Sequence, residues 1–417
     1  MIQKTVLENG VRVVSESQPH AFSATVGLWM EVGSRDEVPL NNGISHFIEH
    51  MAFKGTGRRG ALDIAREIDR LGGMANAFTS RENTCFHCRA LAERLPEMCD
   101  LLTDIFLHPA LDPLELERER GVILQEIGGL EDAPDELVHV LFGEHFWPGH
   151  PLGRSILGSQ QTIEAMDRQA IASYLESNYL PCRAVISAVG SLEHQQVVDL
   201  VGPVLSKLPA NPEPALRRPP DPRPGLQVIN RDLEQVHVAL GLAAPHATSA
   251  KRYQAAVLNL ILGGNMSSRL FQEVRERRGL AYAVYSYLSS YSDSGLLGIY
   301  LGVAPERVVE ALKVVRQELA GLAAAPVSEQ ELADSKENLR GAILLAAENP
   351  ESRMSRLARN EYNFGRDVPL KEALAQVQAV TQEDVASLAG ELLAPGNLAA
   401  TVLGPVDEDA LPGELAW

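Results

Sequence analysis

The chain has 417 residues, of which 45% are hydrophobic and 22% are charged. This composition is typical of a globular protein and excludes a disordered chain, and the length predicts two or three domains. The formal net charge of −18 argues against nucleic acid as a partner. No window approaches 18 uncharged apolar residues, so we expect no membrane partner and no spanning helix. The four cysteines are too few for a disulfide scaffold.

The N-terminal sequence consists of strand-forming residues from the beginning. Residues 1–14 surround Asn9-Gly10, a dipeptide typical of a hairpin turn, which predicts two short strands. The segment has neither the apolar stretch of a secretory signal nor the arginine-rich character of a transit peptide. We therefore expect a cytoplasmic protein.

Hydrophobic periodicity predicts strands and helices along the whole chain. In the first half, strands are expected near 11–16, 23–32, 74–80, 83–90 and 184–190, and helices near 42–54, 61–71, 94–107, 112–131, 160–177 and 194–206. In the second half, strands are expected near 226–231, 235–242, 282–290, 294–303 and 397–404, with helices between them. Strand pairs with helices on one face predict an α+β fold with a mainly antiparallel sheet in each half, and not a doubly wound parallel sheet.

A proline-rich segment marks a break near the middle of the chain, with seven prolines from Pro209 to Pro224. Proline lacks the amide hydrogen and restricts the residue before it, so this segment can form neither a helix nor a central strand. We expect a semi-rigid linker over residues 209–224. It separates a first domain, residues 1–208, from a second domain, residues 225–417.

The two halves contain a similar segment at a similar depth. Residues 67–78 and 273–284 are 206 positions apart, and in each a helical pattern ends at glycine and is followed by an alternating strand. Such junctions are common on their own, but their matching position favours a duplication. A second strand and an amphipathic helix follow in each half, the helices at 95–107 and 305–322.

The strongest chemical motif is His46-Phe47-Ile48-Glu49-His50. A four-residue spacing places both histidines on one helix face, with Cβ atoms about 5–6 Å apart, where two imidazoles can bind one zinc ion. Glu49 lies beside His50 in the order of the inverzincin signature. The alternative is a pair of surface histidines. However, the apolar neighbours predict a largely buried helix, in which two histidines and a glutamate need partners.

A catalytic zinc site takes three protein ligands and leaves one position open. The helix expected at 112–131 contains Glu119 and Glu126, which are seven residues apart and share a face. Val122 and Ile123 also lie toward that face, which suggests that both carboxylates point inward. By spacing alone, charge-rich helices of this kind are more often solvated, so the identity of the third ligand stays undecided at this point.

These motifs resemble those of the pitrilysin, insulysin and mitochondrial processing peptidase family of zinc endopeptidases. The resemblance rests on residues 46–56 and on Glu126 within residues 123–127, and it extends over nearly the whole chain. Further matching segments are residues 76–82, 150–153, 263–271 and 275–282. The length is similar to that of the short, two-domain branch, in which two subunits form a clamshell and which includes bacterial relatives of the mitochondrial enzyme.

The resemblance implies a role for each residue of the zinc motif. His46, His50 and Glu126 would bind Zn²⁺, one ion per chain, and Glu49 would be the catalytic base. Glu119 matches a second family carboxylate, which supports catalysis without being the main ligand.

The resemblance also implies contacts with substrate in both halves. Arg275 and Tyr282 match a pair that binds the substrate near the zinc, from the opposing half of the assembly. The strand at 74–80 is a plausible edge that accepts an extended peptide as an added strand, although a plain hairpin strand explains its pattern equally well. Its candidate substrate-binding residues are Asn76, Ala77 and Phe78.

These residues predict a zinc-dependent endopeptidase that cleaves peptides or unfolded segments inside a homodimeric chamber. Zinc would polarise the scissile carbonyl, and a zinc-bound water would attack it with Glu49 as general base. Peptides are the expected partners, and the acidic charge favours basic ones. The alternative is a non-catalytic core or substrate-binding subunit of a larger complex. Loss of the zinc motif usually marks such relatives, whereas this chain has both the motif and the Arg/Tyr pair.

Three other motifs carry weaker signals. Cys85 and Cys88 have CxxC spacing, but residues three apart in a strand point to opposite sheet faces, which favours structural thiols. His150 is expected in a loop. The glycines at 263–264 lack the rest of a phosphate-binding motif.

Overall fold

A computed structural model describes residues 2–209, 216–394, 396–407, 409 and 411. Two compact units make up the chain. Unit 1 consists of Met1–Gly129, Arg154–Arg217 and Leu345–Val368, and unit 2 consists of Leu130–Gly153, Arg218–Leu344 and Pro369–Trp417. Of the expected linker, residues 210–215 lie outside the described ranges, and residues 216–224 form neither helix nor strand.

Unit 1 is built on a six-stranded sheet. Its strands are β1 (Ile2–Val6), β2 (Arg12–Ser17), β3 (Ser23–Met30), β4 (Met74–Thr79), β5 (Thr84–Leu91) and β6 (Ala184–Gly190). Their order is β1-β2-β6-β3-β5-β4, so β4 is an edge strand. Only β2 and β6 pair in parallel, and the remaining pairs are antiparallel. The hairpin of β1 and β2 predicted around Asn9-Gly10 is confirmed.

The helices of unit 1 agree closely with the predicted ranges, with one exception. They are α1 (Ile44–Ala52), α2 (Ala61–Leu71), α3 (Leu95–Leu107), α4 (Pro113–Glu131), α6 (Gln160–Ala165), α7 (Arg168–Asn178) and α8 (His194–Leu205). The unit also contains α12 (Pro350–Phe364), for which no range was predicted. The single helix predicted at 160–177 is wrong, because the chain is extended at Met166. Asp167 then forms the N-cap of α7, where its side chain accepts a hydrogen bond from the amide of Ala170.

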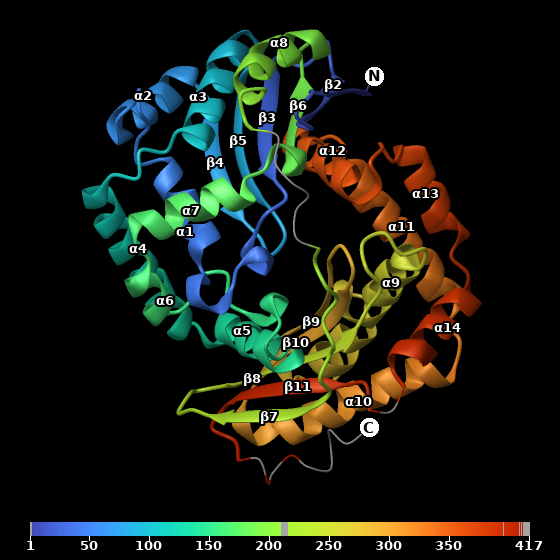
Figure 1. The fold of residues 1–417 in the computed structure, drawn as a ribbon. Helices are drawn as coiled ribbons and strands as arrows, with labels where there is room; N and C mark the ends of the chain where they lie inside the picture. Colours follow the sequence, from blue (N-terminus) through green and yellow to red (C-terminus); the bar gives the residue numbers. More distant parts are fainter. Residues whose placement is uncertain (1, 210–215, 395, 408, 410, 412–417) are drawn as a thin grey trace. The chain divides into compact units, whose positions relative to one another are not determined.

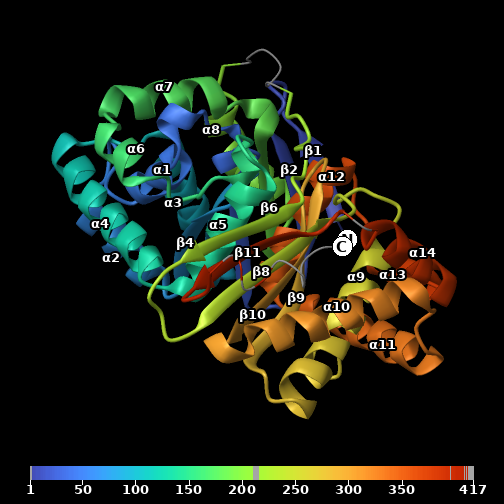
Figure 2. The same cartoon turned by 90° about the horizontal axis from the view of Figure 1, so that it is seen from below.

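Unit 2 repeats the arrangement of unit 1. Its strands are β7 (Gly225–Asn230), β8 (Val236–Ala243), β9 (Ala281–Ser290), β10 (Gly295–Val303) and β11 (Ala399–Gly404). Their order is β7-β11-β8-β10-β9, and β8, β9, β10 and β11 are labelled in Figure 2. The first and last strands of the repeat, β7 and β11, pair in parallel, as β2 and β6 do in unit 1. Without β1, the first sheet has the same order. The shared topology supports the predicted duplication.

The helices of unit 2 surround that sheet. They are α5 (Pro134–Phe146), α9 (Arg252–Asn259), α10 (Val308–Ala324), α11 (Glu329–Ala346), α13 (Leu370–Ala379) and α14 (Gln382–Leu392), with π-helical turns at Leu260–Gly264 and Phe271–Arg277. The sequence analysis missed α5. None of the helices in the described ranges is both long and apolar enough to cross a membrane.

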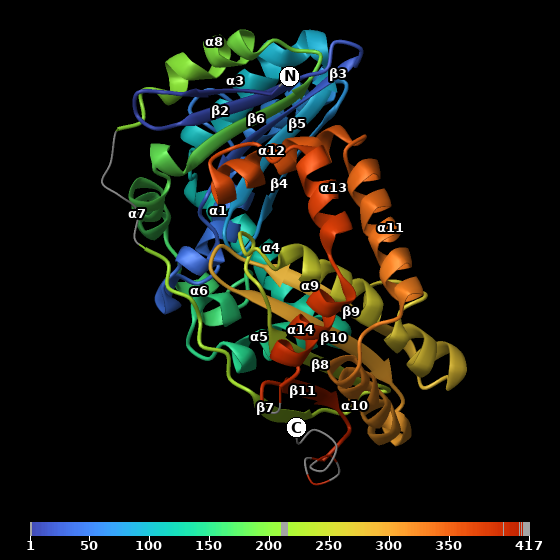
Figure 3. The same cartoon turned by 90° about the vertical axis from the view of Figure 1, so that its right-hand side faces the viewer.

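The predicted α+β class is confirmed, but the expectation of helices on one face alone needs correction. The main core of unit 1 lies between one sheet face and the other helices of the unit, whereas α12 covers the opposite face (Figures 1 and 3). Met354 and Leu357 of α12 pack there against Trp29 and Val185. In unit 2, α5 covers the corresponding face of the second sheet. Each of these helices therefore belongs to the unit formed mostly by the other half of the sequence.

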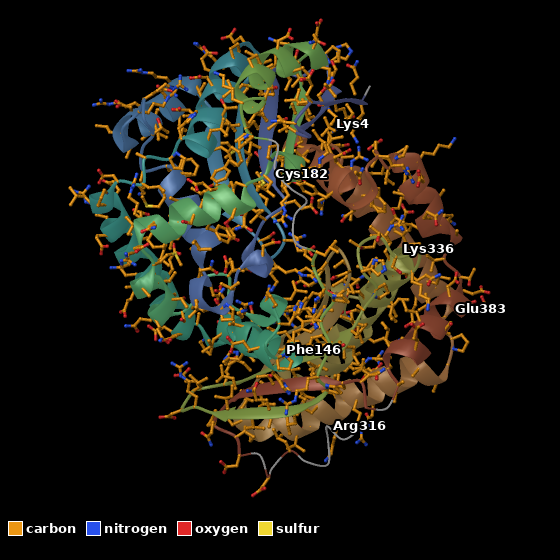
Figure 4. The ribbon with its side chains drawn as sticks, viewed as in Figure 1. Lys4, Phe146, Cys182, Arg316, Lys336 and Glu383 are labelled. Carbon is orange, nitrogen blue, oxygen red and sulfur yellow. The ribbon has the colours of Figure 1, made fainter. Side chains whose placement is uncertain are left out.

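Two glycines, one in each sheet, make room for the two helices. A Cβ atom at Gly27 of β3 would collide with the sulfur of Met354 on α12, and one at Gly241 of β8 would collide with the ring of Phe142 on α5. Ion pairs also hold α12, including a 2.6 Å contact between Lys4, labelled in Figure 4, and Glu361. Burying an aliphatic side chain such as Leu357 contributes roughly 1.5–3 kcal/mol to the free energy of unfolding. Helix α12 is therefore an integral part of unit 1.

Candidate metal centre

Helix α1 carries the zinc motif on a half-buried face. Ile44, Phe47, Ile48 and Met51 recur at helical spacing and are buried in the core of unit 1. His46, Glu49 and His50 lie on the neighbouring face, and 13% and 17% of the two histidine side chains remain accessible. The core therefore fixes the helix while the three polar side chains face a partly open space.

The structure brings His46, His50 and Glu126 together. Nε2 of His46 lies 3.6 Å from Oε2 of Glu126, and Nε2 of His50 lies 3.7 Å from Oε1 of the same carboxylate. The centroids of the two imidazoles are 4.6 Å apart. Among the described residues, this trio is the one group of three His, Cys, Asp or Glu side chains whose ligand atoms all lie within 4.8 Å.

These residues fit a zinc ion. Ligand atoms bound at about 2.0–2.1 Å to a tetrahedral zinc lie roughly 3.4 Å from one another, close to the spacing between the imidazole nitrogens and Glu126. Burial, with a smaller contribution from neighbouring His50, lowers the pKa of His46 to about 4, so its imidazole is neutral at pH 7, as a metal ligand must be. Its buried Nδ1 has no hydrogen-bond partner within the described ranges.

Glu119 holds the ring of His50 from the side opposite the ligand nitrogen. Oε2 of Glu119 lies 3.0 Å from Nδ1 of His50, and its Oε1 accepts a 2.7 Å contact from Nζ of Lys54. A carboxylate in this position fixes the tautomer that leaves Nε2 free for a metal. The structure thus places Glu119 beside the candidate ligand His50. The role of Lys54 was not predicted, because it depends on a tertiary contact between the segment that follows α1 and helix α4.

The inward orientation predicted for the face of α4 is correct only in part. Glu119 and Ile123 are buried. Val122, in contrast, is 40% exposed, and 41% of the Glu126 side chain is accessible. The inference from Val122 was therefore wrong, because the centre opens to solvent on the side of Glu126.

The candidate base Glu49 has a partner that the sequence analysis missed. The hydroxyl of Thr79, the last residue of β4, donates a 2.6 Å hydrogen bond to Oε2 of Glu49. Burial raises the pKa of Glu49, and the hydrogen bond from Thr79 opposes that shift. Thr79 lay within a motif already noted, but nothing in the spacing of the sequence indicated that β4 would lie against α1.

Strand β4 combines an open edge with alternating side chains. Ala77 is buried toward the main core, whereas Asn76 and Phe78 point to the other face, with Phe78 39% exposed. The amide of Ala77 donates a 2.9 Å hydrogen bond to the side chain of Asn76. An edge strand of this kind can pair with a further extended chain.

Arg275 and Tyr282 lie together in unit 2, whereas the three candidate metal ligands lie in unit 1. The guanidinium of Arg275 stacks over the ring of Tyr282, 5.0 Å from its centroid, and lies 4.8 Å from that of Phe271. Gly279 between them has φ of +59°, a conformation that favours glycine. Tyr282 is 82% exposed, so its hydroxyl can reach a ligand.

The CxxC motif has a structural explanation. Cys85 and Cys88 are buried on opposite faces of the sheet, in separate cores, as predicted. Burial raises the pKa of both thiols, which makes them inert.

Comparison with known proteins agrees with this geometry. Residues 12–160 match the model of the insulinase family, peptidase family M16, and residues 165–339 match the peptidase M16 inactive domain. An uncharacterized zinc protease of Streptomyces coelicolor is 38% identical over 98% of this chain and 90% of its own length. The uncharacterized zinc protease YmxG of Bacillus subtilis is 39% identical over 94% of this chain and 96% of its own.

The chain belongs to the M16 peptidase family. The resemblance recognised in the sequence is therefore confirmed. Two crystal structures share the M16 fold: a protease from Helicobacter pylori, with a TM-score of 0.89, 22% identity and coverage of 97% of this chain and 99% of that chain, and a peptidase M16 inactive domain from Pseudomonas fluorescens, with a TM-score of 0.91, 20% identity and coverage of 97% and 98%.

Proposed function

We propose that this chain is a zinc-dependent endopeptidase that cleaves extended peptides or unfolded segments. The observation that carries the proposal is the convergence of His46, His50 and Glu126 beside Glu49. The names of its zinc protease relatives support the choice of metal. Zinc in such a site supplies Lewis acidity toward a carbonyl and makes water more acidic.

The remaining steps depend on side chains of this chain. Glu49 is the general base: its carboxylate takes a proton from the attacking water and passes it to the leaving amine. Thr79 orients that carboxylate, and Glu119 orients the ring of His50. The Arg275 guanidinium and the Tyr282 hydroxyl are suited to donate hydrogen bonds to the substrate carbonyl or to the oxyanion.

The edge of β4 would bind the substrate as an added strand. Backbone hydrogen bonds then provide affinity for any extended peptide, and the side chains of Asn76 and Phe78 contact its side chains. A folded protein cannot present such a strand, so it should resist cleavage.

We extend the proposal to a cytoplasmic homodimer that encloses the cleavage sites in a chamber, with one zinc ion per chain. This part rests on the resemblance to two-subunit relatives and on the presence of both the zinc motif and the Arg/Tyr pair in one chain. A homodimer could then build two complete sites.

A second candidate is a non-catalytic subunit. The match of residues 165–339 to the peptidase M16 inactive domain and the fold shared with the P. fluorescens inactive domain favour it. The complete set of candidate ligands in unit 1 favours the enzyme instead, because a partly buried His/Glu cluster is costly to desolvate and a subunit without catalysis gains nothing from it.

The deciding experiment measures zinc content and hydrolysis of an internally quenched peptide. Wild type should hold about one zinc per chain and cleave. Glu49→Gln should keep zinc and lose cleavage, while His46→Ala and His50→Ala should lose both. His20→Ala, a change of an exposed histidine in the same unit, serves as the matched control. A wild-type protein that holds zinc but cleaves no peptide would favour the non-catalytic subunit, and a Glu49→Gln protein that still cleaves would show that another group is the base.

A further inference from the structure

We infer that Glu37 is a positioning residue for the metal centre: its side chain forms the N-terminal cap of α1 and thereby fixes the backbone that carries His46. The inference rests on the proposed function and deepens it, because it concerns how the zinc ligands are held in place before a metal binds. Glu37 lies outside the zinc motif and touches none of the three candidate ligands.

The carboxylate of Glu37 satisfies the first amide groups of the helix. Its Oε2 accepts 2.8 Å hydrogen bonds from the amide of Gly43 and from Nδ2 of Asn42, and its Oε1 accepts a 2.9 Å bond from the amide of Ser45. The first amides of a helix have no partner within the helix. Both oxygens of Glu37 are therefore used to supply partners at the beginning of α1.

The burial of Glu37 makes this arrangement costly unless the hydrogen bonds form. Glu37 is only 2% exposed, and a buried carboxylate needs hydrogen bonds to compensate for lost water. Burial raises the pKa of Glu37, and the hydrogen bonds from Asn42, Ser45 and Gly43 oppose that shift. A buried carboxylate of this kind needs an explanation, and the capping of α1 provides one.

The helix cannot be capped from its usual position. The N-cap residue is Gly43, which has no side chain to accept a hydrogen bond. Its φ is +95°, and a Cβ atom there would lie 2.7 Å from the carbonyl oxygen of Leu157 and 2.8 Å from Cδ1 of Ile163. Because Asp, Ser or Asn would not fit at this position, the cap has to come from elsewhere in the fold.

The cap acts on the metal centre through the first turn of α1. The helix begins at Ile44, so His46 is its third residue, whereas His50 lies a full turn further along. If the first turn frays, Nε2 of His46 moves away from Glu126. Metal binding must then order this turn again, and the conformational entropy that is lost weakens the affinity for zinc. Removing Glu37 should therefore weaken zinc binding, although it leaves every ligand in the sequence.

The test measures the zinc dissociation constant of stripped protein by competition with a chromophoric chelator. Glu37→Ala should bind zinc about 10- to 100-fold more weakly than wild type, the range typical of lost support to a ligand. Glu37→Gln keeps the shape, but its amide nitrogen must face one of the N–H donors, so it should give an intermediate loss. Saturating zinc should restore most of the peptidase activity in both variants.

Asn349→Ala is the matched control. The side chain of Asn349 accepts hydrogen bonds from the amides of Glu351 and Ser352 and caps α12, in the same unit as the metal centre. Helix caps stabilise a fold by similar amounts, so Asn349→Ala should lower the thermal stability about as much as a Glu37 variant does. Because Asn349 caps a different helix, its loss should leave the zinc dissociation constant within about twofold of wild type. An unchanged zinc affinity in Glu37→Ala, or an equal loss in Asn349→Ala, would overturn the inference.

Hydrogen exchange of the metal-free protein provides a readout that needs neither zinc nor activity. Amides at 44–49 should exchange faster in the Glu37 variants than in wild type or in Asn349→Ala. If wild type binds no zinc, the proposed function fails, and this measurement still decides whether Glu37 holds the first turn. If Glu37→Ala does not fold, Glu37→Gln alone is compared, and unchanged exchange in it would contradict the inference.

Discussion

Thr79 and Glu49 are joined by a hydrogen bond of 2.6 Å that links the edge strand β4 to the candidate catalytic base. The hydroxyl of Thr79 has one hydrogen to donate, and the nearest acceptor is Oε2 of Glu49, closer than the 3.4 Å to the carbonyl oxygen of Ser45. The bond fixes the direction of the carboxylate and favours its ionised form. The strand proposed to bind substrate and the group proposed to move the proton are therefore held in one arrangement.

Replacing Thr79 by valine should slow hydrolysis without removing zinc. Valine has the same shape but cannot donate, and a hydrogen bond to a charged group contributes about 1.5–3 kcal/mol, so we expect kcat to fall about 10- to 100-fold. KM and zinc content should stay near wild type. Thr79→Ser retains the hydroxyl and should recover most of kcat. A Thr79→Ser enzyme as slow as Thr79→Val would mean that the methyl group, and not the hydrogen bond, is what matters.

Mixing two inactive variants tests the proposed homodimer. Glu49→Gln lacks the base, and Arg275→Ala lacks a proposed substrate contact, so each alone should be nearly inactive. If Arg275 serves the zinc of the partner chain, a mixed dimer contains one site with both groups, and part of the activity should return. Subunit exchange is followed by native mass spectrometry. Mixed dimers without activity would show that Arg275 serves the zinc of its own chain.

The acidic charge should favour basic substrates. A net charge of −18 produces a negative field that raises the association rate of cationic peptides. We expect a higher kcat/KM for an Arg-rich peptide than for a Glu-rich peptide of equal length. The difference should shrink as the Debye length falls from about 10 Å at 0.1 M salt to about 3 Å at 1 M. Equal values for the two peptides at low salt would exclude steering and leave the mechanism untouched.

Glu331 at the start of α11 should make stability depend on pH. Burial raises its pKa, but hydrogen bonds from Arg269 and Ser328 outweigh that effect and lower the pKa from 4.5 to about 2. Because the folded state binds the proton less readily, this stabilisation is present above about pH 4.5 and is lost as the pH falls toward 2. Glu331→Gln should therefore unfold at lower urea concentration than wild type at pH 7, and the difference should narrow below pH 4.5.

The control for that measurement is Glu337→Gln on the same helix. Glu337 pairs with Arg340 at an exposed position, where ion pairs contribute little. Glu337→Gln should therefore unfold at the same urea concentration as wild type at every pH. A difference between wild type and Glu331→Gln that stays constant from pH 7 to pH 3 would contradict the assignment.

Local features of the sequence were enough to predict helix α1 and the placement of its two histidines on one face. The four-residue spacing of His46 and His50 is a property of any α-helix, and the apolar positions around it fix which side is buried. The third ligand could be assigned only through resemblance, since Glu126 reaches α1 by the packing of a separate helix. The contacts of Thr79 and Lys54 join residues far apart in the sequence, and the cap from Glu37 depends on the conformation of the loop before α1, so none of them leaves a spacing signal.

The missed helix α5 was visible in part. Pro134 in the first turn, acidic Asp135 and Glu136 after it, and apolar Val138 and Phe142 four residues apart are typical of a helix start and a buried stripe. Which sheet that stripe would cover could not be predicted, because the linear division at the prolines assigned it to the first half. The compact units include it in unit 2.

The exchange of α5 and α12 has a consequence for biosynthesis. Helix α12 packs against a sheet face that includes Val14, Trp29 and Val185. These three residues are synthesised long before residues 350–364 leave the ribosome. The polypeptide must therefore keep an apolar sheet face from aggregating until α12 has been synthesised, a period in which chaperones act. For the same reason, a protease nick in the proline-rich linker would not release a self-sufficient N-terminal fragment, because part of its interior is encoded more than a hundred codons downstream.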